Sequence, residues 1–76
     1  MAKTATRNVG KTEFVCLLNQ YNAESLCQKK FQQYAQQVGD PQLRNMLENF
    51  SNQCEQRSSR LASMLQECGG GNYVSS

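Results

Sequence analysis

The chain has no histidine and no tryptophan, and it contains a single proline among its 76 residues. Without histidine, the Ser–His and Cys–His nucleophile pairs of many hydrolytic enzymes are excluded. The three glycines at 69–71 follow the second long Pro-free segment and do not precede a helix, so they are not a phosphate-binding loop. We therefore expect a protein that is not an enzyme and has no cofactor.

Long apolar runs and strong charge are also lacking. No segment is apolar enough to span a membrane, and the polar stretch 1–11 lacks the apolar core of a secretory signal. Eight Lys and Arg against six Asp and Glu leave a net charge of +2, too weak to predict nucleic acid as a partner. A chain this short buries a marginal core, so it needs a covalent staple or a partner.

The sequence divides into a flexible basic arm at 1–10, a helical hairpin at 11–68 and a flexible Gly-rich tail at 69–76. Apolar residues recur at steps of three and four over 11–38 and again over 42–67, which predicts a helix in each range. The first series is Phe14, Leu17, Tyr21, Phe31, Ala35 and Val38, and the second is Leu43, Leu47, Phe50, Cys54, Leu61, Met64 and Cys68. The apolar face of each helix is wide enough for a bundle core.

The turn at 39–41 joins the two helices. Gly39 can adopt the left-handed conformation that ends a helix, Asp40 can cap the next helix, and Pro41 suits its first turn. So short a connection folds the helices back on each other, which predicts an all-α fold: an antiparallel two-helix hairpin. The alternative is one long helix kinked at Pro41.

Four cysteines form two pairs about this turn. Cys27 and Cys54 lie equally far from its centre, which makes an inner disulfide between them geometrically natural. An outer disulfide between Cys16 and Cys68 would have to absorb an offset of about 5 Å along the helices.

Other states of the cysteines stay open. They can be reduced and buried as small apolar residues, or they can cross-link separate chains, above all Cys16 and Cys68 near the open end. A four-cysteine zinc site is disfavoured because the hairpin holds the two pairs far apart. The C-x10-C and C-x13-C spacings do not meet the twin C-x9-C motif of the coiled-coil-helix proteins of the mitochondrial intermembrane space.

The residues around the turn resemble a known family. The run from Tyr34-Ala35 through Asp40-Pro41-Gln42-Leu43-Arg44, followed by Phe50-Ser51-Asn52-Gln53, is similar to small spore-coat proteins of the ferritin-like superfamily. The resemblance covers about residues 14–66. It implies half of a ferritin-like bundle, in which two hairpins pair as a homodimer to complete a four-helix bundle.

The chain departs from this family at the metal site. Ferritin-like sites use a Glu on one helix and Glu-x-x-His on the next. Aligned through the turn, the Glu-x-x-His positions fall on Cys54 and Arg57, and only Glu24 remains near the first carboxylate. No metal is therefore expected. Glu24 and Arg57 lie level across the hairpin, which predicts a buried ion pair in place of the metal; the alternative is that both side chains extend to solvent.

Together these features predict a structural protein, similar to spore-coat proteins, that self-associates and is stabilised by disulfides. The alternative is a disulfide-stapled helical binding module, or a released factor, that engages another protein. The resemblance places the protein in the spore coat or at the cell exterior, whereas the absence of a signal peptide otherwise indicates the cytoplasm.

Overall fold

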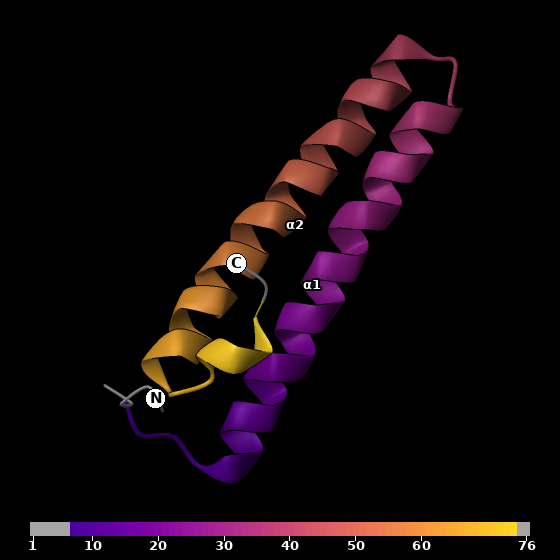
Figure 1. Ribbon diagram of the computed structural model, residues 1–76. Coiled ribbons are helices and arrows are strands. Elements are labelled where there is room, and N and C mark those ends of the chain that lie inside the picture. Colours follow the sequence, from indigo (N-terminus) through magenta and orange to yellow (C-terminus); the bar gives the residue numbers. More distant parts are fainter. Residues whose placement is uncertain (1–6, 75–76) are drawn as a thin grey trace.

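In the computed structural model of this protein, residues 7–74 are described, and they form two long α-helices and one short 3-10 helix. Helix α1 comprises Lys11–Gln37, α2 comprises Pro41–Glu67, and the 3-10 helix η1 comprises Gly71–Tyr73. The two long helices run antiparallel, side by side (Figure 1). The predicted all-α antiparallel hairpin is thereby confirmed, with both helix bounds at the turn one residue earlier than expected.

The molecule is a slab one helix thick. Its principal extents are 47 × 23 × 13 Å, and its radius of gyration is 15.2 Å. A compact globule of this length would have a radius of gyration of about 11 Å. Each helix therefore has one side against its neighbour and the rest of its surface open.

The interior between the helices is correspondingly small. The buried apolar residues are Tyr21, Ala35, Cys54 and Leu65. Three polar residues are buried with them, namely Glu24, Ser51 and Ser58. The two serines satisfy their hydroxyls on backbone carbonyls: Ser51 Oγ donates to the Gln28 carbonyl of the opposite helix at 3.1 Å, and Ser58 Oγ donates within α2. Part of the helix contact is therefore polar.

The turn is capped from its α2 side. The Asp40 carboxylate accepts hydrogen bonds from the backbone N–H groups of Gln42 at 2.8 Å and Leu43 at 3.4 Å. Pro41, which has no N–H, occupies the first position of α2, where none is needed. These local interactions fix where α2 begins.

The predicted left-handed conformation of Gly39 is wrong, because Gly69 is the only residue with positive φ within residues 7–74. α1 ends instead at Gln37, and the residue that caps it, Val38, has an extended backbone. The Arg44 guanidinium donates to the Val38 carbonyl at 3.0 Å. A cation from the next helix thus satisfies a carbonyl group at the end of α1. Gly39 then needs no special conformation, and a Cβ there would meet no atom within 4 Å.

The left-handed glycine cap lies at the other end of α2. Gly69 has φ of 85°, its N–H donates to the Gln66 carbonyl, and the Gly70 N–H donates to the Leu65 carbonyl. This pair of bonds is the Schellman motif, which requires a residue with positive φ at the position of Gly69. The motif turns the chain back toward α1.

Both terminal segments fold onto the open end of the hairpin. The Tyr73 ring packs edge-on against Phe14 with centroids 5.9 Å apart, and Gly70 approaches the same Phe14 ring so closely that a Cβ would lie 2.7 Å from it. The Arg7 N–H donates to the Glu67 carbonyl at 2.9 Å. The segments assigned to a flexible arm and tail thus include ordered contacts, while 1–6 and 75–76 lie outside the described residues.

Within residues 7–74, neither long helix has a stretch apolar enough, over a sufficient length, to cross a membrane.

The two glycines provide a matched test of the caps. We expect Gly69→Ala to lower the free energy of unfolding by about 1–2 kcal/mol, because alanine is strained in the left-handed conformation. Gly39→Ala should leave it unchanged or raise it slightly, since neither backbone nor space opposes a Cβ there. Urea unfolding followed by circular dichroism measures both. Equal destabilisation by the two substitutions would contradict the assignment of the caps.

Candidate functional site

Four polar or sulfur-containing side chains meet halfway along the hairpin: Glu24, Cys27, Cys54 and Arg57, here named the central cluster. Arg57 Nε donates a charged hydrogen bond across the helix interface to Glu24 Oε2. The Glu24 side chain is only 10% exposed, whereas that of Arg57 is 50% exposed. The ion pair is therefore buried on the carboxylate side and open to solvent on the guanidinium side.

The Arg57 guanidinium serves two partners at once. Its Nη2 lies 3.4 Å from Cys54 Sγ, while its Nε is held by Glu24. The hydrogen bond to Glu24 raises the pKa of Arg57 above its ordinary value. An arginine guanidinium is charged at physiological pH in any case. A permanent cation thus sits against a buried thiol.

Cys54 is the most deeply buried member of the cluster, with 1% of its surface exposed. Burial raises the pKa of the Cys54 thiol, and the neighbouring Cys27 thiol raises it further through a hydrogen bond and through its charge. The charge of Arg57 acts in the opposite direction. Cys27 is half-buried and therefore more accessible to solvent than Cys54.

The inner cysteine pair lies level across the hairpin beside the Glu24–Arg57 ion pair, and the outer pair has no such position in the described part of the chain. Cys16 is exposed on α1, and Cys68 is half-buried at the end of α2; no interaction joins them within residues 7–74. All four cysteines are free thiols in the structure. The disulfides therefore stay predictions, with a geometric basis only for the pair Cys27 and Cys54.

The ion pair occupies the place where the resemblance to ferritin-like proteins put metal ligands. In the part of the chain that the structure describes, no group of three or more Asp, Glu, Cys or His side chains is arranged to hold a metal ion. In the central cluster, the Arg57 guanidinium occupies Glu24 Oε2.

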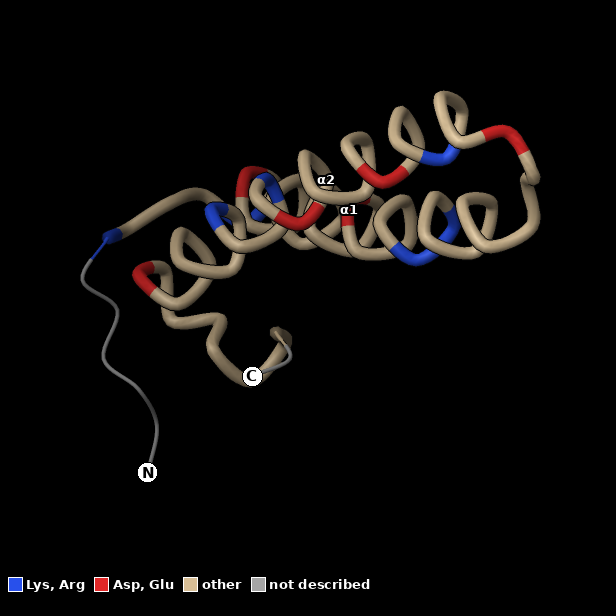
Figure 2. The backbone as a smooth tube through the Cα atoms, turned by 90° about the horizontal axis from the view of Figure 1, so that it is seen from above, with Lys and Arg blue, Asp and Glu red and all other residues tan. Residues whose placement is uncertain are grey.

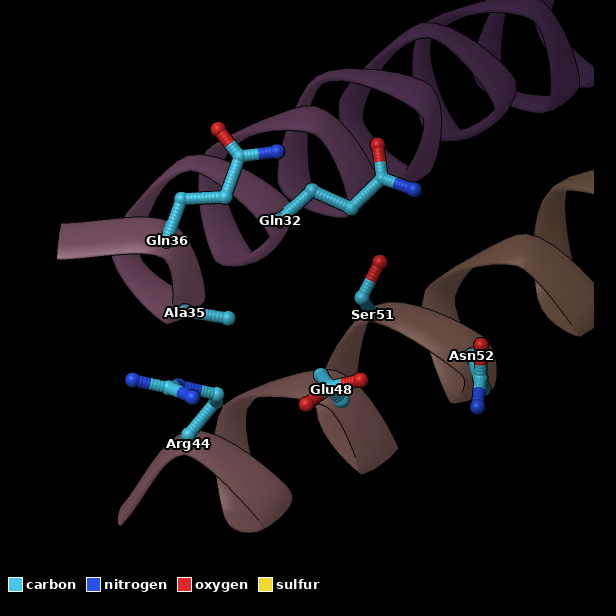
Figure 3. Close-up of a pocket in the computed structure, with 7 residues that line it drawn as sticks. All are labelled: Gln32, Ala35, Gln36, Arg44, Glu48, Ser51 and Asn52. Atoms are coloured by element: carbon cyan, nitrogen blue, oxygen red, sulfur yellow. The ribbon is translucent and has the colours of Figure 1, made fainter. Parts of the chain in front are cut away.

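Beside the central cluster, the two broad sides of the slab differ in character. One side carries two open grooves between α1 and α2, here named the polar face. The groove near the turn has a volume of about 550 Å³ and is lined by Gln32, Ala35, Gln36, Arg44, Glu48, Ser51 and Asn52 (Figure 3). The second groove, nearer the open end, is lined largely by serine, glutamine and charged side chains. The polar side chains of this surface can stay hydrated in the single chain.

The other side, here named the apolar face, is built from Phe31, Tyr34, Leu43, Met46 and Phe50. The Phe31 ring contacts Phe50 across the hairpin, with centroids 5.4 Å apart, and contacts Tyr34 at 6.4 Å. Leu43, Met46 and Phe50 follow each other at steps of three and four, which keeps them on one side of α2. Phe50 is 40% exposed and Met46 is 53% exposed.

The sequence did not separate these two faces. The sequence placed Leu43 and Phe50 on a face wide enough for a bundle core, and in the single chain both are exposed. Their exposure follows from the single-layer architecture, which buries one narrow stripe per helix, centred on Ser51, Cys54 and Leu65 in α2. The signal was present in the spacing, because Met46 and Phe50 are displaced around the helix from that stripe.

Charge does not distinguish a single binding surface. Basic and acidic residues are interspersed along both helices in the described part of the chain (Figure 2). A mixed surface of this kind does not single out a partner of opposite charge.

A family model described as a domain of unknown function (DUF2383) matches residues 22–74. This range covers well over half of the chain, so the protein belongs to the DUF2383 family. It includes the whole central cluster, the turn, all of α2 and η1. No curated protein and no solved structure matches the chain.

A double-mutant cycle tests the ion pair. Arg57→Met should destabilise the hairpin because it leaves the buried Glu24 carboxylate without its partner, and Glu24→Gln in the same chain should remove much of that penalty. The measurement is the free energy of unfolding in urea, with reductant, for the two single variants and the double variant. Arg60→Met, one turn away on the exposed side of α2, is the matched control. Additive effects would show that the pair contributes no coupling.

Proposed function

We propose that this member of the DUF2383 family is a non-catalytic structural protein, a half-bundle that pairs with a second copy of itself into a four-helix bundle and is further stabilised by disulfides. The observation that carries this proposal is the apolar face, whose aromatic and aliphatic side chains lie exposed in the single chain.

The shape of the hairpin supports a second layer of helices. A slab one helix thick cannot cover both sides of either helix, and within residues 7–74 the buried apolar set comprises four residues. Domains are stable when two or more layers enclose one core. A second hairpin that packs on the apolar face would place the Phe31–Phe50 aromatic contact at the centre of such a core.

A second copy is the occupant that the chain's own chemistry favours. In a two-fold dimer the same patch is used on both sides, so the patch must be self-complementary. An apolar face meets this condition. Tyr34, Met46 and Phe50 would be buried against the same residues of the second copy, and no like charges would be brought together. With a net charge of only +2, repulsion between two copies is small.

The resemblance to spore-coat proteins supports a location for this structural protein in an assembled coat. In such a setting, the exposed Cys16 is the thiol best placed to cross-link neighbouring dimers, whereas the inner pair would lock each hairpin. The corresponding location is the spore coat or the cell exterior.

The alternative function is a helical binding module for another protein, and the apolar face also supports it. Tyrosine, phenylalanine, methionine and arginine are the residues enriched at protein–protein interfaces, and the face with its neighbour Arg57 contains all four. The two proposals differ in what the purified protein does: a structural protein covers its apolar face with a second copy, whereas a binding module leaves the face open until another protein binds.

Met46→Glu should break the proposed dimer. Met46 is exposed and lies at the centre of the α2 part of the face, so the substitution would bury two carboxylates in the dimer while leaving the hairpin itself intact. Light scattering after size exclusion, with reductant and over a range of concentrations, should give a dimer for the parent chain and a monomer for Met46→Glu.

Asn52→Glu is the control, because Asn52 lies on the polar face and the variant should stay dimeric. A parent chain that is monomeric at all concentrations would reject self-association and favour the binding module.

A further inference from the structure

The central cluster places two thiols of unequal accessibility next to each other. Cys54 is almost completely buried, whereas Cys27 is half-buried on α1, one turn before Phe31 of the apolar face. The antiparallel register that pairs Arg57 with Glu24 also sets Cys27 and Cys54 level with each other, three residues nearer the turn on each helix. Arg57 Nη2 donates to Cys54 Sγ at 3.4 Å. Cys16 and Cys68 have no comparable arrangement within the described residues.

We propose that Cys27 and Cys54 form a thiol–disulfide exchange site that reacts with low-molecular-weight disulfides, in which Cys27 is attacked first and Cys54 closes the bond under the guidance of Arg57. This inference deepens the disulfide stabilisation contained in the proposed function and rests on that part of it, but it does not require self-association.

In the first step, Cys27 loses its proton to solvent and its thiolate attacks one sulfur of the external disulfide. The disulfide S–S bond breaks, a mixed disulfide forms on Cys27 Sγ, and the other half leaves as a thiolate that takes up a proton. Cys54 performs this step more slowly than Cys27, because an external disulfide has little access to its buried Sγ.

In the second step, Cys54 loses its proton and its thiolate attacks Cys27 Sγ. The bond to the external half breaks, and that half leaves as a second thiolate, which is protonated. In total, two protein thiols are oxidised to one disulfide, one external disulfide is reduced to two thiols, and two protons pass between them. The external disulfide is the only oxidant required.

Arg57 is the positioning residue for the second step. A thiolate at Cys54 would form in a buried place, where burial and the charge of Glu24 disfavour it and the Arg57 charge favours it. The hydrogen bond from Nη2 to Sγ places that cation directly on the sulfur, and the ion pair with Glu24 holds the guanidinium there. The ion pair therefore contributes to reactivity as well as to the fold.

The test uses the full chain with Cys16→Ser and Cys68→Ser, treated with oxidised glutathione and followed by mass spectrometry after acid quench. The parent of this series should form the internal disulfide with little glutathione adduct. Cys54→Ser should accumulate one adduct on Cys27, and Cys27→Ser should form an adduct on Cys54 at least about tenfold more slowly. Cys54→Ala replaces Cys54→Ser if circular dichroism shows that the latter has lost its helices.

Arg57→Met should accumulate the mixed disulfide on Cys27 before closure, and the pH at which closure reaches half its maximal rate should move upward. Arg60→Met should behave as the parent. A purely structural role of Arg57 would change helicity but not this pH profile.

Faster adduct formation on Cys54 than on Cys27, or closure unaffected by Arg57→Met, would overturn the proposal. Repeating the series with Met46→Glu separates it from self-association: the same order of reaction is expected in a chain that does not dimerise.

Discussion

The geometry of a two-helix contact governs this molecule. Two helices side by side can each bury one stripe of residues, and here that stripe supplies only four buried apolar residues: Tyr21, Ala35, Cys54 and Leu65. Three further features follow from this shortage. Polar residues share the interface, the terminal segments add contacts around Phe14 at the open end, and an apolar face stays uncovered at the closed end. The polar contacts and the terminal segments add stability to the hairpin, whereas the uncovered apolar face calls for a further layer of protein.

The Glu24–Arg57 pair is the most consequential of the polar contacts. An ion pair with one buried and one half-exposed partner contributes modestly to stability, because desolvation of the carboxylate offsets much of the attraction. Its larger effect is on what the site can do. By occupying the Glu24 carboxylate, Arg57 opposes cation binding, and by donating to Cys54 it turns a buried thiol into a candidate for disulfide chemistry.

Features set by neighbours in sequence were predictable. The start of α2 follows from the Asp40 carboxylate and the ring of Pro41, both local, and the level placement of Glu24 and Arg57 follows from the shortness of the turn. Features set by distant residues were not. Gly39 lost its expected role because Arg44 caps the end of α1, and no pattern in the sequence indicated that Tyr73 would return to Phe14. The spacing of apolar residues did not show which of them the hairpin buries and which form the exposed apolar face.

The central claim is that the hairpin completes its core with a second copy of itself, and the concentration dependence of unfolding tests it most directly. For a folded dimer that unfolds to two chains, each tenfold rise in protein concentration stabilises the folded state by about 1.4 kcal/mol of dimer. In reductant, which removes cross-links, the urea midpoint should therefore rise steadily with concentration. A midpoint that does not move over a hundredfold range would show that the single hairpin is the complete folding unit, and would contradict the account.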